Sequence, residues 1–78
     1  MSQEICQKIQ AAIEGAIPDS QVEVHGGGGH YTVNVTANAF AGKPMVQAHR
    51  LVYSAIAHLM DGDGAPVHAI DTLQTRAP

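Results

Sequence analysis

Cysteine and cationic residues are scarce in this sequence of 78 residues, and tryptophan is absent. The single cysteine, Cys6, excludes an intramolecular disulfide and an all-cysteine metal site, and it favours a reducing compartment. Four Lys and Arg residues stand against seven Asp and Glu residues, which gives a formal net charge of −3. The chain as a whole therefore has no basic field of the kind that attracts nucleic-acid phosphates.

Long apolar runs are also missing. No stretch approaches the roughly 20 apolar residues that a membrane-spanning helix needs, and residues 1–4 lack the basic and apolar regions of a signal peptide. We therefore expect a cytoplasmic protein with no membrane partner. The composition, with 45% hydrophobic and 14% charged residues, is typical of a globular chain. The length predicts a single domain over residues 1–78.

The first half of the chain changes from a helical to an alternating pattern. Apolar residues at helical spacing from Ile5 to Ile17 predict a helix that ends at Pro18. Alternation over residues 21–25 and 30–37 then predicts a β-hairpin around four glycines, residues 26–29.

The simplest hairpin register keeps every apolar side chain on one face. It pairs Val24 with Tyr31 and places His25 directly opposite His30 on the polar face.

The second half predicts a helix and a third strand. Pro44 suits the first position of a helix, and its expected apolar stripe consists of Met45, His49, Val52, Tyr53, Ile56 and Met60. Residues 61–64, Asp-Gly-Asp-Gly, predict a turn. The β-branched run from Val67 to Leu73 predicts a strand, and residues 74–78 a frayed tail. The expected class is α+β.

Motifs for catalysis are weak. A phosphate-binding loop needs Lys and Ser or Thr after the glycines and then a helix, whereas residues 26–29 lead into His-Tyr and a strand. Ser20 and Ser54 lack the strand-to-helix elbow of hydrolases, and no acidic pair occupies an apolar setting suited to acid–base work. We expect no enzymatic activity.

The five histidines differ in their prospects. His58 lies off the helical stripe and is expected to be solvated, and His49 lies on the stripe as a packing residue. His25 and His30 flank the glycine loop, and His68 opens the last strand; these three are candidate metal ligands, since neutral imidazole binds borderline metals well. Two histidines make an incomplete zinc site, so the residues alone leave a ligand role open.

Three segments resemble the BolA-like family. Residues 40–53, FAGKPMVQAHRLVY, resemble its signature F-x-G-K followed by V-x-R-H-R-x-V-Y. Residues 22–24 with 29–31 resemble its first hairpin, and residues 67–70 resemble its last strand. The match covers roughly residues 5–73, the expected core, and the short glycine loop with Gly-His-Tyr is closest to the IbaG-type branch.

The resemblance implies a fold of α-β-β-α-α-β order with a three-stranded mixed sheet, similar to a type II KH domain. The nucleic-acid loop of KH domains joins two helices, whereas the glycines here lie in a hairpin. Likeness of fold alone therefore does not carry nucleic-acid binding over.

The resemblance also implies a partner and a cofactor. BolA-like proteins work with monothiol (CGFS) glutaredoxins in iron–sulfur cluster trafficking and iron homeostasis, and the pair shares a [2Fe–2S] cluster. The glutaredoxin cysteine and glutathione hold one iron, while this chain supplies His68 and a loop histidine, His30 or His25. No cluster is expected in the isolated chain. Lys43, His49 and Arg50 are expected to help the partner dock. Histidine ligation should raise the potential of the cluster and make it sensitive to pH.

Two other functions remain open. The first is a transcriptional regulator that binds nucleic acid through the KH-like fold. The net charge, Ala48 in place of the usual basic residue of the signature, and a chain that stops soon after Thr75 all weigh against it. The second is an interaction module whose histidines are only structural.

Overall fold

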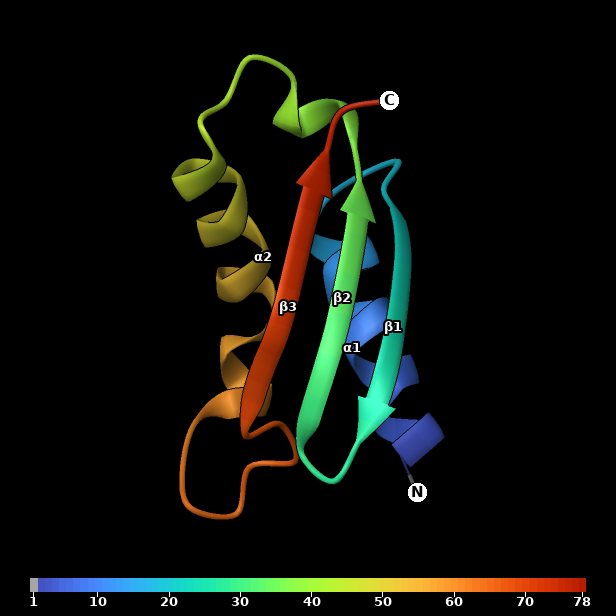
Figure 1. Cartoon of the computed structure of the whole chain (residues 1–78), viewed down its shortest axis with the longest axis vertical. Helices are drawn as coiled ribbons and strands as arrows, with labels where there is room; N and C mark the ends of the chain where they lie inside the picture. Colours follow the sequence, from blue (N-terminus) through green and yellow to red (C-terminus); the bar gives the residue numbers. More distant parts are fainter. Residues whose placement is uncertain (1) are drawn as a thin grey trace.

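The computed structural model describes residues 2–78 and confirms the α+β class. Within these residues the elements follow in the order α-β-β-α-β, with one short 3₁₀ helix: α1 (Ser2–Ala16), β1 (Gln21–Gly27), β2 (His30–Thr36), η1 (Asn38–Phe40), α2 (Met45–Met60) and β3 (Ala69–Arg76). Both helices lie against one face of the sheet, and no element of residues 2–78 covers the other face (Figure 1). None of the helices in this range is long and apolar enough to cross a membrane.

The sheet is mixed, as expected. Its strand order is β1-β2-β3, and β2 pairs antiparallel with β1 and parallel with β3. A parallel neighbour cannot be reached by a tight turn, so α2 carries the chain from the end of β2 back to the beginning of β3 (Figure 1). As a result, the β1–β2 turn and the entry into β3 lie at the same end of the sheet.

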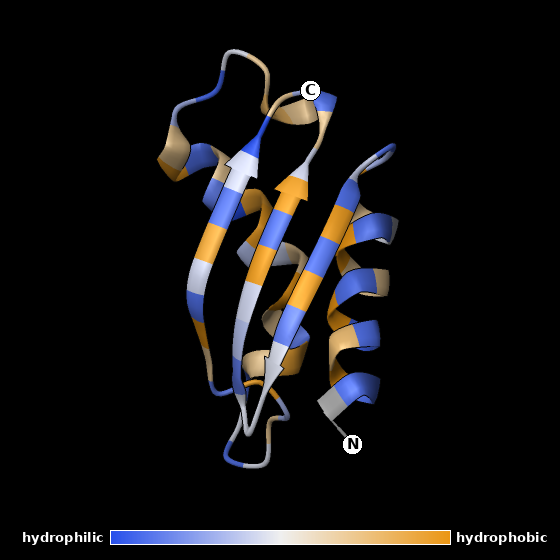
Figure 2. Cartoon of the chain, turned by 45° about the vertical axis from the view of Figure 1, so that its right-hand side comes forward, coloured by the Kyte–Doolittle hydropathy of each residue, from blue (hydrophilic) through white to orange (hydrophobic). Residues whose placement is uncertain are grey.

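The core lies between the sheet and the helices. In β2, Tyr31, Val33 and Val35 are buried, and the residues between them are partly exposed. Figure 2 shows this alternation as successive apolar and polar bands. The predicted stripe of α1 is confirmed, because Ile9 and Ile13 are fully buried. The opposite face of the sheet is polar and open to solvent.

The predicted stripe of α2 is wrong in part. Its buried residues are Ala48, Val52, Ile56 and Leu59, whereas Met45 is 71% and Tyr53 38% exposed. Both stripes contain Val52 and Ile56, but the helix is rotated so that alanine and leucine face the sheet. The small side chain of Ala48 lets the beginning of the helix lie close to the core. Hydropathy alone ranks alanine below methionine and therefore favours Met45 for burial.

The resemblance implies two helices between β2 and β3, and only α2 is a full α-helix. The position of the first is taken by η1, a single 3₁₀ turn in which Phe40 is buried. Gly42 then adopts a positive φ of 74°, and Pro44, whose backbone lacks an N–H, caps α2. The amides of Gln47 and Ala48 donate to the Pro44 carbonyl.

The third strand also differs from its predicted bounds. It begins at Ala69 and continues to Arg76, so residues 74–76, expected to be frayed, pair with residues 34–36 of β2. Val67 lies before the strand and is buried, and its amide donates to the Leu59 carbonyl. The tail is ordered by the backbone ladder with β2, which the apolar pattern does not reveal.

Candidate functional site

The hairpin turn consists of two glycines rather than four. Gly28 and Gly29 have φ of 63° and 87°, the pair of positive values that a type I′ turn requires. Gly26 and Gly27 belong to β1. The predicted register is therefore wrong by two residues: Val24 pairs with Val33, His25 with Thr32 and Gly27 with His30. A shift of two keeps each side chain on its predicted face, but His25 and His30 are not opposite one another.

His68 is held against this turn. The backbone amides of His68 and Ala69 both donate to the carbonyl oxygen of Gly29, at 2.8 and 2.9 Å. The His68 ring lies so close to the Cα of Gly29 that a Cβ there would overlap ring atom Cδ2 and come within 2.9 Å of Cγ. His68 itself is exposed and precedes β3 by one residue. The absence of a side chain at residue 29 therefore allows the imidazole to lie against the turn.

His30 follows Gly29 directly and faces the open side of the sheet. It pairs with Ala69 of β3, and its Nδ1 lies 3.1 Å from Oδ1 of Asp71. The His30 side chain is 59% exposed. His30 and His68 are therefore both anchored at the junction of the β1–β2 turn with β3, and both are open to solvent.

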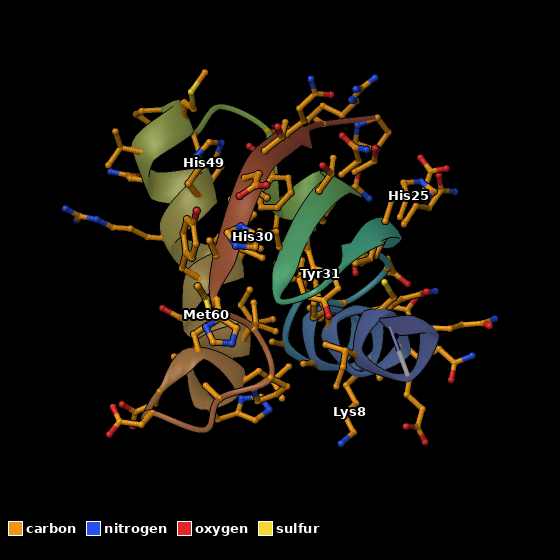
Figure 3. The ribbon with its side chains drawn as sticks, turned by 60° about the horizontal axis from the view of Figure 1, so that its bottom comes forward. Lys8, His25, His30, Tyr31, His49 and Met60 are labelled. Atoms are coloured by element: carbon orange, nitrogen blue, oxygen red, sulfur yellow. The ribbon has the colours of Figure 1, made fainter. Side chains whose placement is uncertain are left out.

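His25 lies farther from this junction. It occupies β1, the strand that does not pair with β3. Figure 3 shows His25 on the outer side of β1 and His30 beside β3. Of the three candidate ligands, the structure brings His30 and His68 to the same junction and leaves His25 one strand away.

The described residues do not complete a metal site. Among residues 2–78, no group of three or more His, Cys, Asp or Glu side chains gathers closely enough to hold a metal ion. Two imidazoles at an exposed end can supply part of a coordination sphere.

The expected docking residues lie at the other end of the sheet. Lys43 and His49 line a hollow of about 510 Å³ between the beginning of α2 and the end of β3. Arg50 is exposed on α2 and does not line the hollow. In Figure 1 the beginning of α2 lies toward the same end of the sheet as the C-terminus, away from the β1–β2 turn. The structure therefore does not bring these residues together with His30 and His68.

Two residues of these regions were not singled out in the sequence. Arg76 lines the hollow beside Lys43, and it was missed because residues 74–78 were expected to be frayed. Asp71 contacts His30. The spacing of Ile70 and Leu73 could have indicated the unusual position of Asp71, which lies between them. Two residues three apart face the same side of a strand only if the strand has a bulge between them.

A pair of matched substitutions tests how His68 is held. Gly28→Ala and Gly29→Ala both place a Cβ at a positive φ, which we expect to cost about 1 kcal/mol of unfolding free energy. The Cβ at residue 28 meets open space, whereas that at residue 29 meets the His68 ring. Gly29→Ala should therefore cost about 1–3 kcal/mol more, as measured by chemical denaturation. It should also shift the NMR signals of His68, which Gly28→Ala should leave in place. Equal stabilities and an unmoved His68 in both variants would contradict this packing.

Comparison with known proteins gives the family. The model of the family described as BolA-like protein matches residues 7–78. A search of curated proteins by sequence found no match.

Solved structures of similar fold support the same family assignment. A BolA protein homologue from Coxiella burnetii is 33% identical, with a TM-score of 0.77 over 92% of this chain and 88% of that one. The BolA domain of SufE1 from Arabidopsis thaliana is 22% identical, with a TM-score of 0.78 over 95% and 92% of the two chains. BolA1 from Mus musculus is 28% identical, with a TM-score of 0.71 over 95% of this chain and 65% of that one. The chain belongs to the BolA-like family.

Proposed function

We propose that this chain is a non-enzymatic partner of a monothiol glutaredoxin in iron–sulfur cluster trafficking or iron-homeostasis signalling. In this proposal His68 and His30 are its ligands to a shared [2Fe–2S] cluster. The observation that carries the proposal is the placement of two exposed imidazoles at one junction. His68 packs on Gly29, and His30 directly follows Gly29 in the chain. Membership of the BolA-like family supports the choice of partner.

The donor set fits one half of such a cluster. Each iron of a [2Fe–2S] cluster takes two ligands beyond the bridging sulfides, and two histidines serve as that pair on one iron in Rieske-type centres. This chain offers the imidazoles of His30 and His68, whose backbones meet at the junction, and no group of three or more His, Cys, Asp or Glu side chains among residues 2–78 could hold a metal ion alone. The cysteine of the glutaredoxin and glutathione would hold the other iron. When bound, the cluster would supply iron and sulfide. This chain would help to carry the cluster in trafficking, or would use its presence as a signal in iron homeostasis.

The chain's own residues perform the positioning. The two amides that donate to the Gly29 carbonyl fix the backbone of His68 against the turn. The parallel pairing of His30 with Ala69 fixes the backbone of His30 beside the same segment. Both histidines are therefore attached through their backbones to the same end of the sheet, and supporting ligands on regular elements favours a defined geometry. Lys43, His49 and the hollow near Arg76 remain candidates for partner docking, away from the ligands.

Reconstitution tests the proposal. The chain is mixed with a monothiol glutaredoxin, iron, sulfide and glutathione, and the complex is isolated by size exclusion. We expect a one-to-one complex whose visible absorption and circular dichroism differ from those of the cluster-bound glutaredoxin homodimer. His30→Ala should abolish the distinct spectrum.

His25→Ala is the matched control, because His25 is also an exposed histidine of the hairpin but lies one strand away. It should leave the spectrum unchanged. A spectrum that stays that of the glutaredoxin homodimer at every ratio would contradict the proposal. Loss in His25→Ala and not in His30→Ala would reverse the choice of ligand.

Nucleic-acid binding is the second candidate, and the basic side chains around the hollow favour it. Lys43 and Arg76, two of the four Lys and Arg residues, line the same hollow. The net charge of −3 and the acidic Glu23 and Asp71, both exposed, oppose it, because phosphate contacts depend on a positive field. An electrophoretic mobility shift that persists at physiological salt would rank it above the cluster role.

A further inference from the structure

Strand β3 has an irregularity at Asp71. Tyr31 pairs with Ile70, but the next residue of β2, Thr32, pairs with Thr72, so that Asp71 has no partner in the ladder. Bulges are rare between parallel strands, and they often re-aim a side chain next to a functional site. Here the bulge lets Ile70 and Leu73, three residues apart, both pack against the core. It also means that the direction of the Asp71 side chain is not set by the regular alternation along β3.

The freed carboxylate meets His30. Its Oδ1 lies 3.1 Å from Nδ1 of the imidazole. Because an ionised carboxylate only accepts hydrogen bonds, Nδ1 must carry the proton and donate it. In the neutral ring the proton is then absent from Nε2, whose lone pair is available to a metal. Both side chains are more than half exposed, so the contact stabilises the fold little, and its effect falls on the orientation and tautomer of the ring.

We propose that Asp71 is a positioning residue that fixes the Nδ1–H tautomer of His30 and presents Nε2 as its coordinating atom. Hydrogen bonding of a ligating histidine to a carboxylate orients the ring and raises its basicity as a ligand. The tautomer is a property of the isolated chain. The coordinating role of Nε2 rests on the proposed function.

The tautomer is read by long-range ¹H–¹⁵N correlation NMR of the isolated chain in mildly alkaline buffer, where imidazoles are neutral. In the unmodified chain, His30 should show a protonated Nδ1 and an unprotonated Nε2. Asp71→Ala should return His30 to the mixture of tautomers that a free imidazole adopts. Asp71→Asn should retain the Nδ1–H form only in part, because its amide can accept from Nδ1–H or donate to an unprotonated Nδ1. Thr72→Ala is the matched control, an exposed neighbour with no hydrogen bond to His30. His25 serves as an internal reference in every spectrum.

Coordination is read from the rate at which a chelator removes the cluster from the complex with the glutaredoxin. Loss of a carboxylate partner weakens metal binding by about 10–100-fold, so Asp71→Ala should release the cluster at least about tenfold faster than Thr72→Ala, and Asp71→Asn should recover part of the difference. An unchanged tautomer in Asp71→Ala, or an unchanged release rate after normal uptake, overturns the inference and leaves the proposed function standing. Failure of the unmodified chain to take up a cluster overturns the proposed function, and with it the coordinating role of Nε2.

Discussion

Replacing Ile56 with alanine is expected to lower the free energy of unfolding by about 2–5 kcal/mol. Ile56 lies in the middle of α2 and is fully buried in the single core between helices and sheet. The substitution removes apolar area from the core and leaves a cavity that a close-packed interior fills only in part. A domain of this length has roughly 4–12 kcal/mol of stability in total. The change therefore removes a large share of it.

Leu51→Ala provides the control for this prediction. Leucine is an isomer of isoleucine, so the same atoms are removed from the same helix, but Leu51 is 39% exposed. We expect it to lose about 1 kcal/mol or less. Urea denaturation should show a lower midpoint for Ile56→Ala at an unchanged slope. Equal midpoints for the two variants would contradict the burial of Ile56 in the core.

The second large effect is expected from His68→Ala, which should prevent stable cluster formation with the glutaredoxin. In the proposed function the substitution leaves one iron with a missing ligand. His68 is exposed and its ring contacts glycine, so its removal should leave the fold nearly unchanged. The loss should therefore appear as a loss of the distinct visible spectrum without a change in the unfolding midpoint.

His58→Ala controls for the general loss of a histidine, because His58 is exposed on α2. It should form the complex and hold the cluster as the unmodified chain does. A His68→Ala chain that gives the same spectrum and the same rate of cluster loss as His58→Ala would remove His68 from the ligand set.

Elements that depend on local patterns could be predicted from the sequence. The stripe of α1 and the alternation of β2 each report burial on one face of one element, and both are confirmed. The stripe of α2 was only half right, because the buried face contains Ala48 and Leu59 rather than their neighbours His49 and Met60. Only packing against the sheet decides in favour of the small residue. The end of β3 could not be predicted, because it is stabilised by pairing with a strand some 40 residues earlier.

The site was predictable only in its residue types. His25 and His30 stood out as histidines that flank a glycine loop, and His68 through its match to the last strand of the family. A run of four glycines does not reveal which two form the turn. The positive φ of Gly28 and Gly29 fixed the register and separated His25 from His30. The contact of His68 with Gly29 and that of Asp71 with His30 join segments far apart in the chain. The spacing of Ile70 and Leu73 indicates an irregularity near Asp71, but no pattern within one element reveals which residues make these contacts.

In the proposed complex, one iron of a shared cluster takes its two protein ligands from this chain, through His68 and His30. The most direct test is pulsed electron paramagnetic resonance of the reduced complex, with ¹⁵N-histidine in this chain and an unlabelled glutaredoxin. We expect strong coupling to two labelled nitrogens, and we expect both couplings to remain in His25→Ala. Coupling to no labelled nitrogen, or couplings that persist unchanged in His68→Ala, would contradict it.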